Sequence, residues 1–274
     1  MRAQYKSVGA SYASPSMRRN KVEQPVNLTL ISCLEFNIVL MLLIGYLFGS
    51  IPVAYLYCKA HGVNIFETGS GNPGSTNVGR VLGKKHGRIV FALDIVKTIL
   101  PILLAHLVIL YLNKIETCDV FYSVIDKSKN YPFKILMYGG TLRDPFVIFT
   151  TGLGAIFGHN FPFTTKFKGG KGITCTVAVI AYLSVPYAII LYFIHKIIGK
   201  VTGYVSIASI LTLIIMFISA VVMTIFRIPP FNPFNNIYPR FILTDIFIIM
   251  MLGIIRHKDN ITRLEKGMEN QIKC

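Results

Sequence analysis

The sequence has few acidic residues: 12 Asp and Glu stand against 28 Lys and Arg, for a formal net charge of +16. A basic soluble protein would suggest a nucleic-acid partner, but here the basic residues lie mostly between apolar runs. Hydrophobic residues make up 53% of the 274 positions, which excludes a disordered or fibrous chain and indicates several membrane spans. We therefore expect no nucleic acid, and basic loops that fix topology and contact anionic membrane lipid.

Cysteine is scarce, and its spacing excludes two kinds of site. The five cysteines are odd in number and widely separated, with no CxxC pair and no Cys/His spacing typical of zinc. The sequence therefore supports neither a disulfide framework nor a metal site, and we expect no cofactor. The first thirty residues also lack an apolar core, so they do not match a cleaved signal peptide. We expect either a flexible N-terminal extension over 1–33 or an upstream start codon with Met17 as the true first residue.

Long apolar runs predict the membrane-spanning helices, each of which needs about twenty residues. The candidates are 34–58, 88–112, 146–163, 201–227 and 240–256. A further apolar run, 172–199, carries Pro186 near its middle, where proline kinks or breaks a helix. This run is either one kinked span or two short spans joined at Ser184–Pro186.

Lysine and arginine are absent from the loop 228–239, and this absence orients the chain, because loops without basic residues lie outside. Basic segments, which should face the cytoplasm, are 59–88, 164–171 and the tail from Arg256. An even number of crossings must then separate residue 171 from residue 256, so the run 172–199 supplies two short spans of about 12 to 14 residues each. We predict an all-α integral membrane protein with seven transmembrane helices and cytoplasmic Gly-rich loops. The long segment 113–145 carries charges of both signs and does not help to orient the chain.

Three polar stretches fall on the predicted cytoplasmic side: Gly69–Arg80, Phe167–Gly172 and Arg256–Asn260. Glycines let backbone N–H groups approach a ligand closely, and neighbouring cations add charge, a combination that suits phosphate. A single loop of this kind could be only a tight turn. The first loop formally fits G-x-G-x-x-G, but it lies between membrane helices rather than in a βαβ unit, and the second lacks the Walker spacing.

Asp94 and Lys97 are unusual because both lie inside an apolar run. Their spacing of three residues puts them on one helical face, where they can pair. The pair could either stabilise the packing of two helices through a polar contact or have a functional role.

The polar stretches belong to longer motifs that occur in order: "YLFGSIPVAYL" (46–56), "GSGNPGSTNVGRVLGKKHG" (69–87), "GHNFPFTTKFKGGKG" (158–172), "YVSIAS" (204–209) and "RHKDNITRLEKG" (256–267). In these motifs the chain closely resembles the bacterial acyl-phosphate:glycerol-3-phosphate acyltransferases, from residue 34 to residue 270. Segments 1–33 and 113–145 have no counterpart in a typical member. Ser75 and Gly79 stand where an alanine and a larger apolar residue are expected.

The resemblance implies seven helices in a bacterial cell membrane, a site facing the cytoplasm, and one acyltransferase domain over 34–274. It implies transfer of an acyl group from acyl phosphate to the 1-hydroxyl of glycerol 3-phosphate, which gives lysophosphatidic acid and phosphate for phospholipid synthesis. Because phosphate is a good leaving group, catalysis needs positioning and charge stabilisation rather than an enzymic nucleophile. Functional coupling to an enzyme that produces acyl phosphate is also suggested.

The resemblance also implies the site residues. Lys171 is the expected essential cation, Ser70 and Arg80 should hold the glycerol phosphate, and Ser209, His257 and Asn260 should complete the catalytic site. Further substrate-binding candidates are Gly69, Gly71, Asn72, Asn77, Lys84, Lys168, Gly169 and Gly170. The proton acceptor is open, since His257 or an oxygen of a substrate phosphate could serve.

Two other function classes are considered. A membrane transporter of an organic phosphate would use glycine breaks near mid-membrane, but no inverted repeat is apparent and the glycine loops fall at the surface. Another lipid enzyme is disfavoured, because none of the six histidines is followed five residues later by aspartate, and the repeated-aspartate signature of phosphatidyltransferases is missing.

Overall fold

The computed structural model describes residues 28–114, 145–231 and 239–271. The segments 1–27 and 115–144 lie outside the described residues, so the predictions for the N-terminal extension and for most of 113–145 are not addressed. Within the described part the chain is helical, without β-strands apart from one isolated bridge between Tyr204 and Gln271. The helices are α1 (Leu28–Gly49), α2 (Val53–Ala60), α3 (Ser75–Val81), α4 (Lys84–Lys114), α7 (Pro145–Asn160), the 3-10 turn η2 (Phe163–Thr165), α8 (Ile173–Leu183), α9 (Val185–Thr202), α10 (Val205–Ile225), α11 (Pro239–Arg256) and α12 (Lys258–Glu265).

Five segments of the described chain are long and apolar enough to cross a membrane, which confirms an all-α integral membrane protein. They are Phe36–Ala60, Lys84–Ile109, Pro145–Thr165, Val185–Thr202 and Val205–Ile225. The helix α8 has only 11 residues, and α11 carries three charged residues: Arg240, Asp245 and Arg256. The helix α8 is too short and α11 too charged to be counted as a span by length and composition, so the count of seven spans stays a prediction.

The apolar run 172–199 is two helices, with the break where the sequence places it. Ser184 has an extended backbone between α8 and α9, and its hydroxyl accepts a hydrogen bond from the Tyr187 N–H at 3.4 Å. The predicted length of the second helix was wrong, because α9 continues for 18 residues to Thr202. It ends at Gly203, whose φ of 79° favours glycine. Lys196 and Lys200 do not stop the helix, since their charged ends are exposed.

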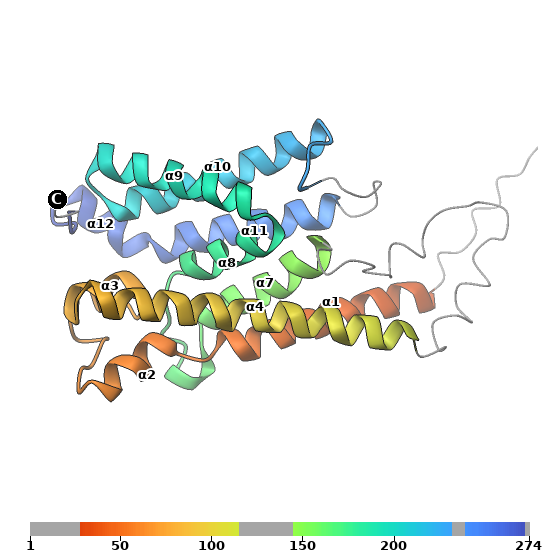
Figure 1. Ribbon diagram of the computed structural model, residues 1–274, viewed down its shortest axis with the longest axis horizontal. Coiled ribbons are helices and arrows are strands. Elements are labelled where there is room, and N and C mark those ends of the chain that lie inside the picture. Colours follow the sequence, from red (N-terminus) through yellow and green to blue (C-terminus); the bar gives the residue numbers. More distant parts are fainter. Residues whose placement is uncertain (1–27, 115–144, 232–238, 272–274) are drawn as a thin grey trace, which may run out of the picture.

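The helices run roughly parallel to one long axis (Figure 1). Close packing of α1 on α7 depends on small residues, because a Cβ at Gly45 would lie 2.1 Å from the Thr151 carbonyl oxygen. The main core joins α4, α7, α8, α10 and α11 through large side chains that include Ile102, Phe149, Ile180, Met216 and Ile246.

The loops that carry the polar stretches meet at one end of this bundle. Figure 1 shows α2, α3, α12 and the C-terminus at the same end. Direct contacts tie this end together, since Lys171 bonds to Asn260 and Arg256 bonds to Gly169 and Gly170. Stretches that are far apart in the sequence therefore surround one region of space.

Candidate functional site

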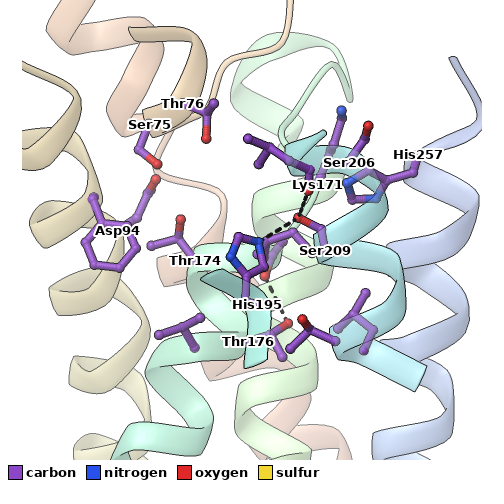
Figure 2. Close-up of a pocket in the computed structure, with 18 of the residues that line it drawn as sticks. Ser75, Thr76, Asp94, Lys171, Thr174, Thr176, His195, Ser206, Ser209 and His257 are labelled. Atoms are coloured by element: carbon purple, nitrogen blue, oxygen red, sulfur yellow. Dashed lines mark hydrogen bonds between the residues drawn. The ribbon is translucent and has the colours of Figure 1, made fainter. Parts of the chain in front are cut away.

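The end of the bundle with the polar loops contains a cavity of about 450 Å³. Figure 2 shows Lys171, Ser206 and His257 together on one side of it, with Ser75 and Thr76 across from them. Deeper in the bundle, the cavity is walled by apolar residues of α8, α9 and α10, which include Val177, Ile180, Leu191, Leu213 and Met216. The cavity thus has a polar, cationic end and an apolar depth, which suits a ligand with an anionic head and an apolar tail.

The first glycine loop is held by a side chain from within its own stretch. Asn77 is buried in α3; its Oδ1 accepts from the Ser70 N–H at 2.9 Å, and its Nδ2 donates to the Thr68 carbonyl at 3.0 Å. Gly69 has a φ of 62°, and a Cβ there would lie 2.2 Å from Asn77 Oδ1. Glycine at this position therefore allows both the left-handed backbone and the amide clamp. The loop turns Ser70 and Arg80 to the cavity lining.

The second glycine loop carries Lys171 to the same cavity. Its Nζ donates a hydrogen bond to Asn260 Oδ1 in α12. Asn260 Nδ2 in turn donates to Glu269 Oε1 at 2.7 Å, and Arg263 Nε donates to Glu269 Oε2 at 2.8 Å. This network ties the essential-cation candidate to the C-terminal stretch and leaves both amide ends of Asn260 bonded.

Burial sets the charge states at the polar end of the cavity. Loss of water lowers the pKa of the Lys171 ammonium to about 8, with the nearby Arg263 and Arg80 charges adding to the effect and Glu269 and Asp259 opposing it. Lys171 is therefore cationic at neutral pH but loses its proton more easily than an exposed lysine.

His257 is neutral at pH 7. Burial, followed by the positive charge of Lys171, lowers its pKa to about 4. Its Nδ1 lies 2.6 Å from the Gly253 carbonyl oxygen, which can only accept, so Nδ1 carries the hydrogen. The other ring nitrogen, Nε2, then keeps its lone pair and can accept a hydrogen bond or a proton.

The cavity brings together eight of the residues expected from the sequence, from all the polar stretches and from α10. They are Ser70, Asn72, Asn77, Arg80, Lys171, Ser209, His257 and Asn260. Six others do not line it: Gly69, Gly71, Lys84, Lys168, Gly169 and Gly170. The glycines shape the loops behind the lining, and Lys84 and Lys168 are exposed.

Sequence reasoning missed several lining residues. Glu269 follows the last motif, 256–267, and its bonds to Ser206, Asn260 and Arg263 could not be inferred from spacing. His195 lies in the middle of α9 and places Nε2 3.4 Å from Ser209 Oγ. Ser75 and Thr76 could have been predicted as lining residues, since both belong to the first polar stretch, Gly69–Arg80.

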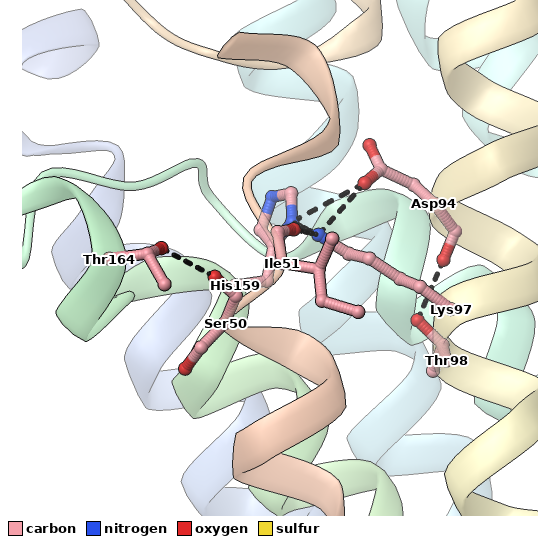
Figure 3. A network of polar contacts seen from close by, with 7 residues as sticks. All are labelled: Ser50, Ile51, Asp94, Lys97, Thr98, His159 and Thr164. Carbon is pink, nitrogen blue, oxygen red and sulfur yellow. Dashed lines mark hydrogen bonds and ion pairs between the residues drawn. The ribbon is translucent and has the colours of Figure 1, made fainter. Parts of the chain in front are cut away.

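The predicted pair between Asp94 and Lys97 is confirmed, with Oδ1 and Nζ 3.0 Å apart and both side chains buried. His159 at the end of α7 joins this pair, with its Nδ1 3.0 Å from Lys97 Nζ. Asp94 and His159 also line the cavity. Asp94 thus places the pair at the cavity wall, and Figure 3 shows its contacts.

Fold and cavity together define a multi-pass, all-helical membrane protein whose cavity is cationic at one end and apolar in its depth. The family described as glycerol-3-phosphate acyltransferase matches residues 39–267. A glycerol-3-phosphate acyltransferase from Aquifex aeolicus is 31% identical over 231 residues, which cover 84% of this chain and 97% of that protein. One from Streptococcus sanguinis is 31% identical over 242 residues, 86% of this chain and 92% of the relative.

Solved structures agree with the sequence matches. The crystal structure of PlsY (YgiH), an integral membrane glycerol 3-phosphate acyltransferase in its glycerol 3-phosphate form, is 30% identical with a TM-score of 0.65, covering 86% of this chain and 96% of that one. Its lysophosphatidic acid form gives a TM-score of 0.63, with 86% and 95% covered. The chain therefore belongs to the glycerol-3-phosphate acyltransferase family and is a membrane acyltransferase.

Proposed function

We propose that this enzyme transfers an acyl group from acyl phosphate to the 1-hydroxyl of glycerol 3-phosphate, on the cytoplasmic side of a bacterial cell membrane. The observation that carries the proposal is that one cavity has both a cationic end and an apolar depth. Both substrates are anionic at one end, and the acyl chain of the donor matches the apolar walls. The names of the relatives support glycerol 3-phosphate as the acceptor.

Six polar residues of the cavity have a role in this proposal. Arg80 and Ser70 hold the phosphate of glycerol 3-phosphate, since a guanidinium matches phosphate oxygens with paired donors. Lys171 lies where the two substrates meet and contacts the phosphate of the donor. Asn260 orients Lys171 through the bond to its Nζ. Ser209 and His257 complete the walls beside the reacting carbonyl.

The reaction is a direct acyl transfer. The hydroxyl oxygen of glycerol 3-phosphate attacks the acyl carbonyl carbon, the bond from that carbon to the phosphate oxygen breaks, and phosphate leaves with the electron pair. Lys171 stabilises the negative charge that gathers on the leaving phosphate. The hydroxyl proton passes to a phosphate oxygen, because a histidine with a pKa of about 4 is a weak base.

The donor is tested with purified protein, radiolabelled glycerol 3-phosphate and either palmitoyl phosphate or acyl-coenzyme A. We expect labelled lysophosphatidic acid with palmitoyl phosphate only, and no change on adding EDTA. Robust turnover with acyl-coenzyme A alone, or loss of activity on chelation, would overturn the donor assignment. Lipid product formed without vesicles excludes transport of an organic phosphate as the main function.

The cytoplasmic placement is tested by labelling single cysteines in a cysteine-free variant. Cysteines in the stretches 69–80, 164–171 and 258–270 should be shielded from impermeant thiol reagents in intact cells, whereas a cysteine at position 235 should react. Labelling of the glycine loops from outside would overturn the orientation. Because acyl phosphate is a reactive anhydride, we also propose coupling to an enzyme that produces it.

A further inference from the structure

In the buried ion pair at the cavity wall, the Lys97 ammonium has three close polar partners. Lys97 Nζ lies 3.0 Å from Asp94 Oδ1, 2.9 Å from the Ile51 carbonyl oxygen and 3.0 Å from His159 Nδ1. Ile51 lies in the break between α1 and α2, and His159 lies in the last turn of α7. One ammonium group therefore joins α4 to two other elements (Figure 3).

This arrangement fixes the state of the His159 ring. An ammonium has three donors and no acceptor, so His159 Nδ1 must accept from Lys97 with its lone pair. The hydrogen of the neutral ring is then on Nε2. Asp94 Oδ1 lies farther from Nδ1, at 3.7 Å, and is the counter-charge of Lys97.

The locked ring lies directly against the second glycine loop. A Cβ built on Gly170 would meet His159 Nε2 at 2.0 Å, and its next neighbours are two carbons of the same ring at 2.9 Å. The Gly170 N–H donates to the His159 carbonyl oxygen at 3.0 Å. Gly170 directly precedes Lys171, so the Nε2 edge of the ring limits how close the loop can come to α7.

We propose that His159, held by the Asp94–Lys97 pair, is a positioning residue that sets the place of Lys171 in the cavity. The inference rests on the proposed role of Lys171 as the cation that contacts substrate phosphate. Lys97 orients the ring, the ring supports the backbone of Gly170, and that backbone delivers the ammonium of the next residue. None of these three groups needs to touch the reacting atoms.

The test is suppression of one substitution by another. Gly170→Ala should lower kcat/KM about a hundredfold, because the new Cβ and the His159 ring cannot occupy one space. Removing the ring should make room, so Gly170→Ala with His159→Ala should recover at least about tenfold over Gly170→Ala alone, although His159→Ala by itself is harmful. A double variant no better than Gly170→Ala would overturn the proposal.

Gly169 offers a matched control in the same loop. A Cβ there would meet the His159 and Asn160 carbonyl oxygens at 2.2 and 2.6 Å and Pro162 Cδ at 2.5 Å, none of which belongs to the ring. His159→Ala should therefore not rescue Gly169→Ala. Equal rescue at both positions would mean that loss of the ring simply loosens the protein, and would overturn a positioning role.

A second measurement does not depend on the folding of the glycine variants. In Asp94→Asn/Lys97→Met, which removes both charges together, kcat should fall about tenfold with KM for glycerol 3-phosphate within about threefold, since binding residues are untouched. Amide exchange of the peptide 166–172, followed by mass spectrometry, should be faster in this variant. Unchanged kcat and unchanged exchange would overturn the proposal. Failure of the proposed function is distinguishable, because wild-type protein would then lack turnover with palmitoyl phosphate.

Discussion

The two glycine-rich loops of the cavity are built in different ways. The first, around Gly69, is held by Asn77 from its own stretch, eight residues along the chain. The second is held from outside: Arg256 donates through Nε to the Gly170 carbonyl at 3.0 Å and through Nη2 to the Gly169 carbonyl at 2.7 Å. The His159 ring closes the other side of the second loop.

The difference shows that glycine serves two physical purposes in one site. At Gly69 it permits a positive φ in a self-contained turn. At Gly170 it permits close approach of backbone to another element. The cation of the second loop therefore depends on tertiary contacts, whereas the first loop depends mainly on local ones.

The largest expected effect belongs to the cation of the second loop. Lys171→Ala should lower turnover a hundredfold or more, which is about 3 kcal/mol at about 1.4 kcal/mol per decade. Lys171→Arg should also have low turnover, because the planar guanidinium of arginine does not replace a compact ammonium in a tight loop. Lys166→Ala is the control: it is exposed and should change little. Near wild-type turnover of correctly inserted Lys171→Ala would mean that the loop is only a turn.

A smaller effect is expected when the outside support of the second loop is removed. Arg256→Ala deletes both bonds to the loop carbonyls and should lower kcat about tenfold. A bond to a charged donor contributes about 1.5 kcal/mol or more, and water at this half-buried side chain offsets part of the loss of the two bonds. Arg256→Lys should be intermediate, because one ammonium cannot span both carbonyls as the guanidinium does. The exposed Lys258→Ala is the control. Steady-state kinetics at saturating substrates measure the effect, and equal kcat in all three variants would contradict it.

The cations of the two loops should also differ in their response to pH. Lys171 is protonated below its pKa of about 8 and loses its charge above it, whereas Arg80 stays charged throughout. Activity should therefore fall about tenfold per pH unit above pH 8. Lys171 does not itself destabilise the fold in this pH range. Its pKa is lower in the folded protein than in the unfolded chain, so its contribution to the free energy of unfolding rises with pH between about 8 and 10.5. A kcat/KM profile that is flat to pH 10 would contradict this.

The smallest effect is expected in the self-contained loop. Asn77→Ala removes two neutral hydrogen bonds and should raise KM for glycerol 3-phosphate about fivefold, since two such bonds at about 0.5 kcal/mol each amount to about 1 kcal/mol. Asn64→Ala is the control, because Asn64 is exposed and its side chain accepts one bond, from the Phe66 N–H at 3.2 Å, outside the cavity lining. A change in kcat with KM unaltered would show that this loop also acts in the chemical step.

Features that depend on residues close together in the sequence could be predicted from it. The helix break at Ser184 follows from Pro186, and the Asp94–Lys97 contact follows from helical spacing in an apolar run. The end of α9 was misplaced because exposed lysines do not end a helix near the membrane surface.

Contacts between distant segments could not be predicted in the same way. The hold of Arg256 on the second loop links residues 86 and 87 positions apart, and the His159 ring meets Gly170 only because α7 and the loop pack together. Glu269 enters the cavity lining through a tail that folds back on α10 and α12. The spacing of these residues along the sequence does not predict that they are in contact.

We expect both glycine-rich stretches to deliver their cations, Arg80 and Lys171, to one phosphate-binding cavity. A crystal structure of this protein with glycerol 3-phosphate and a non-hydrolysable analogue of acyl phosphate tests it most directly. We predict one phosphate at Arg80 and Ser70, the other within hydrogen-bond distance of Lys171 Nζ, and the acyl chain between α8, α9 and α10. Phosphate groups bound away from both loops, or an acyl chain outside this cavity, would contradict the account.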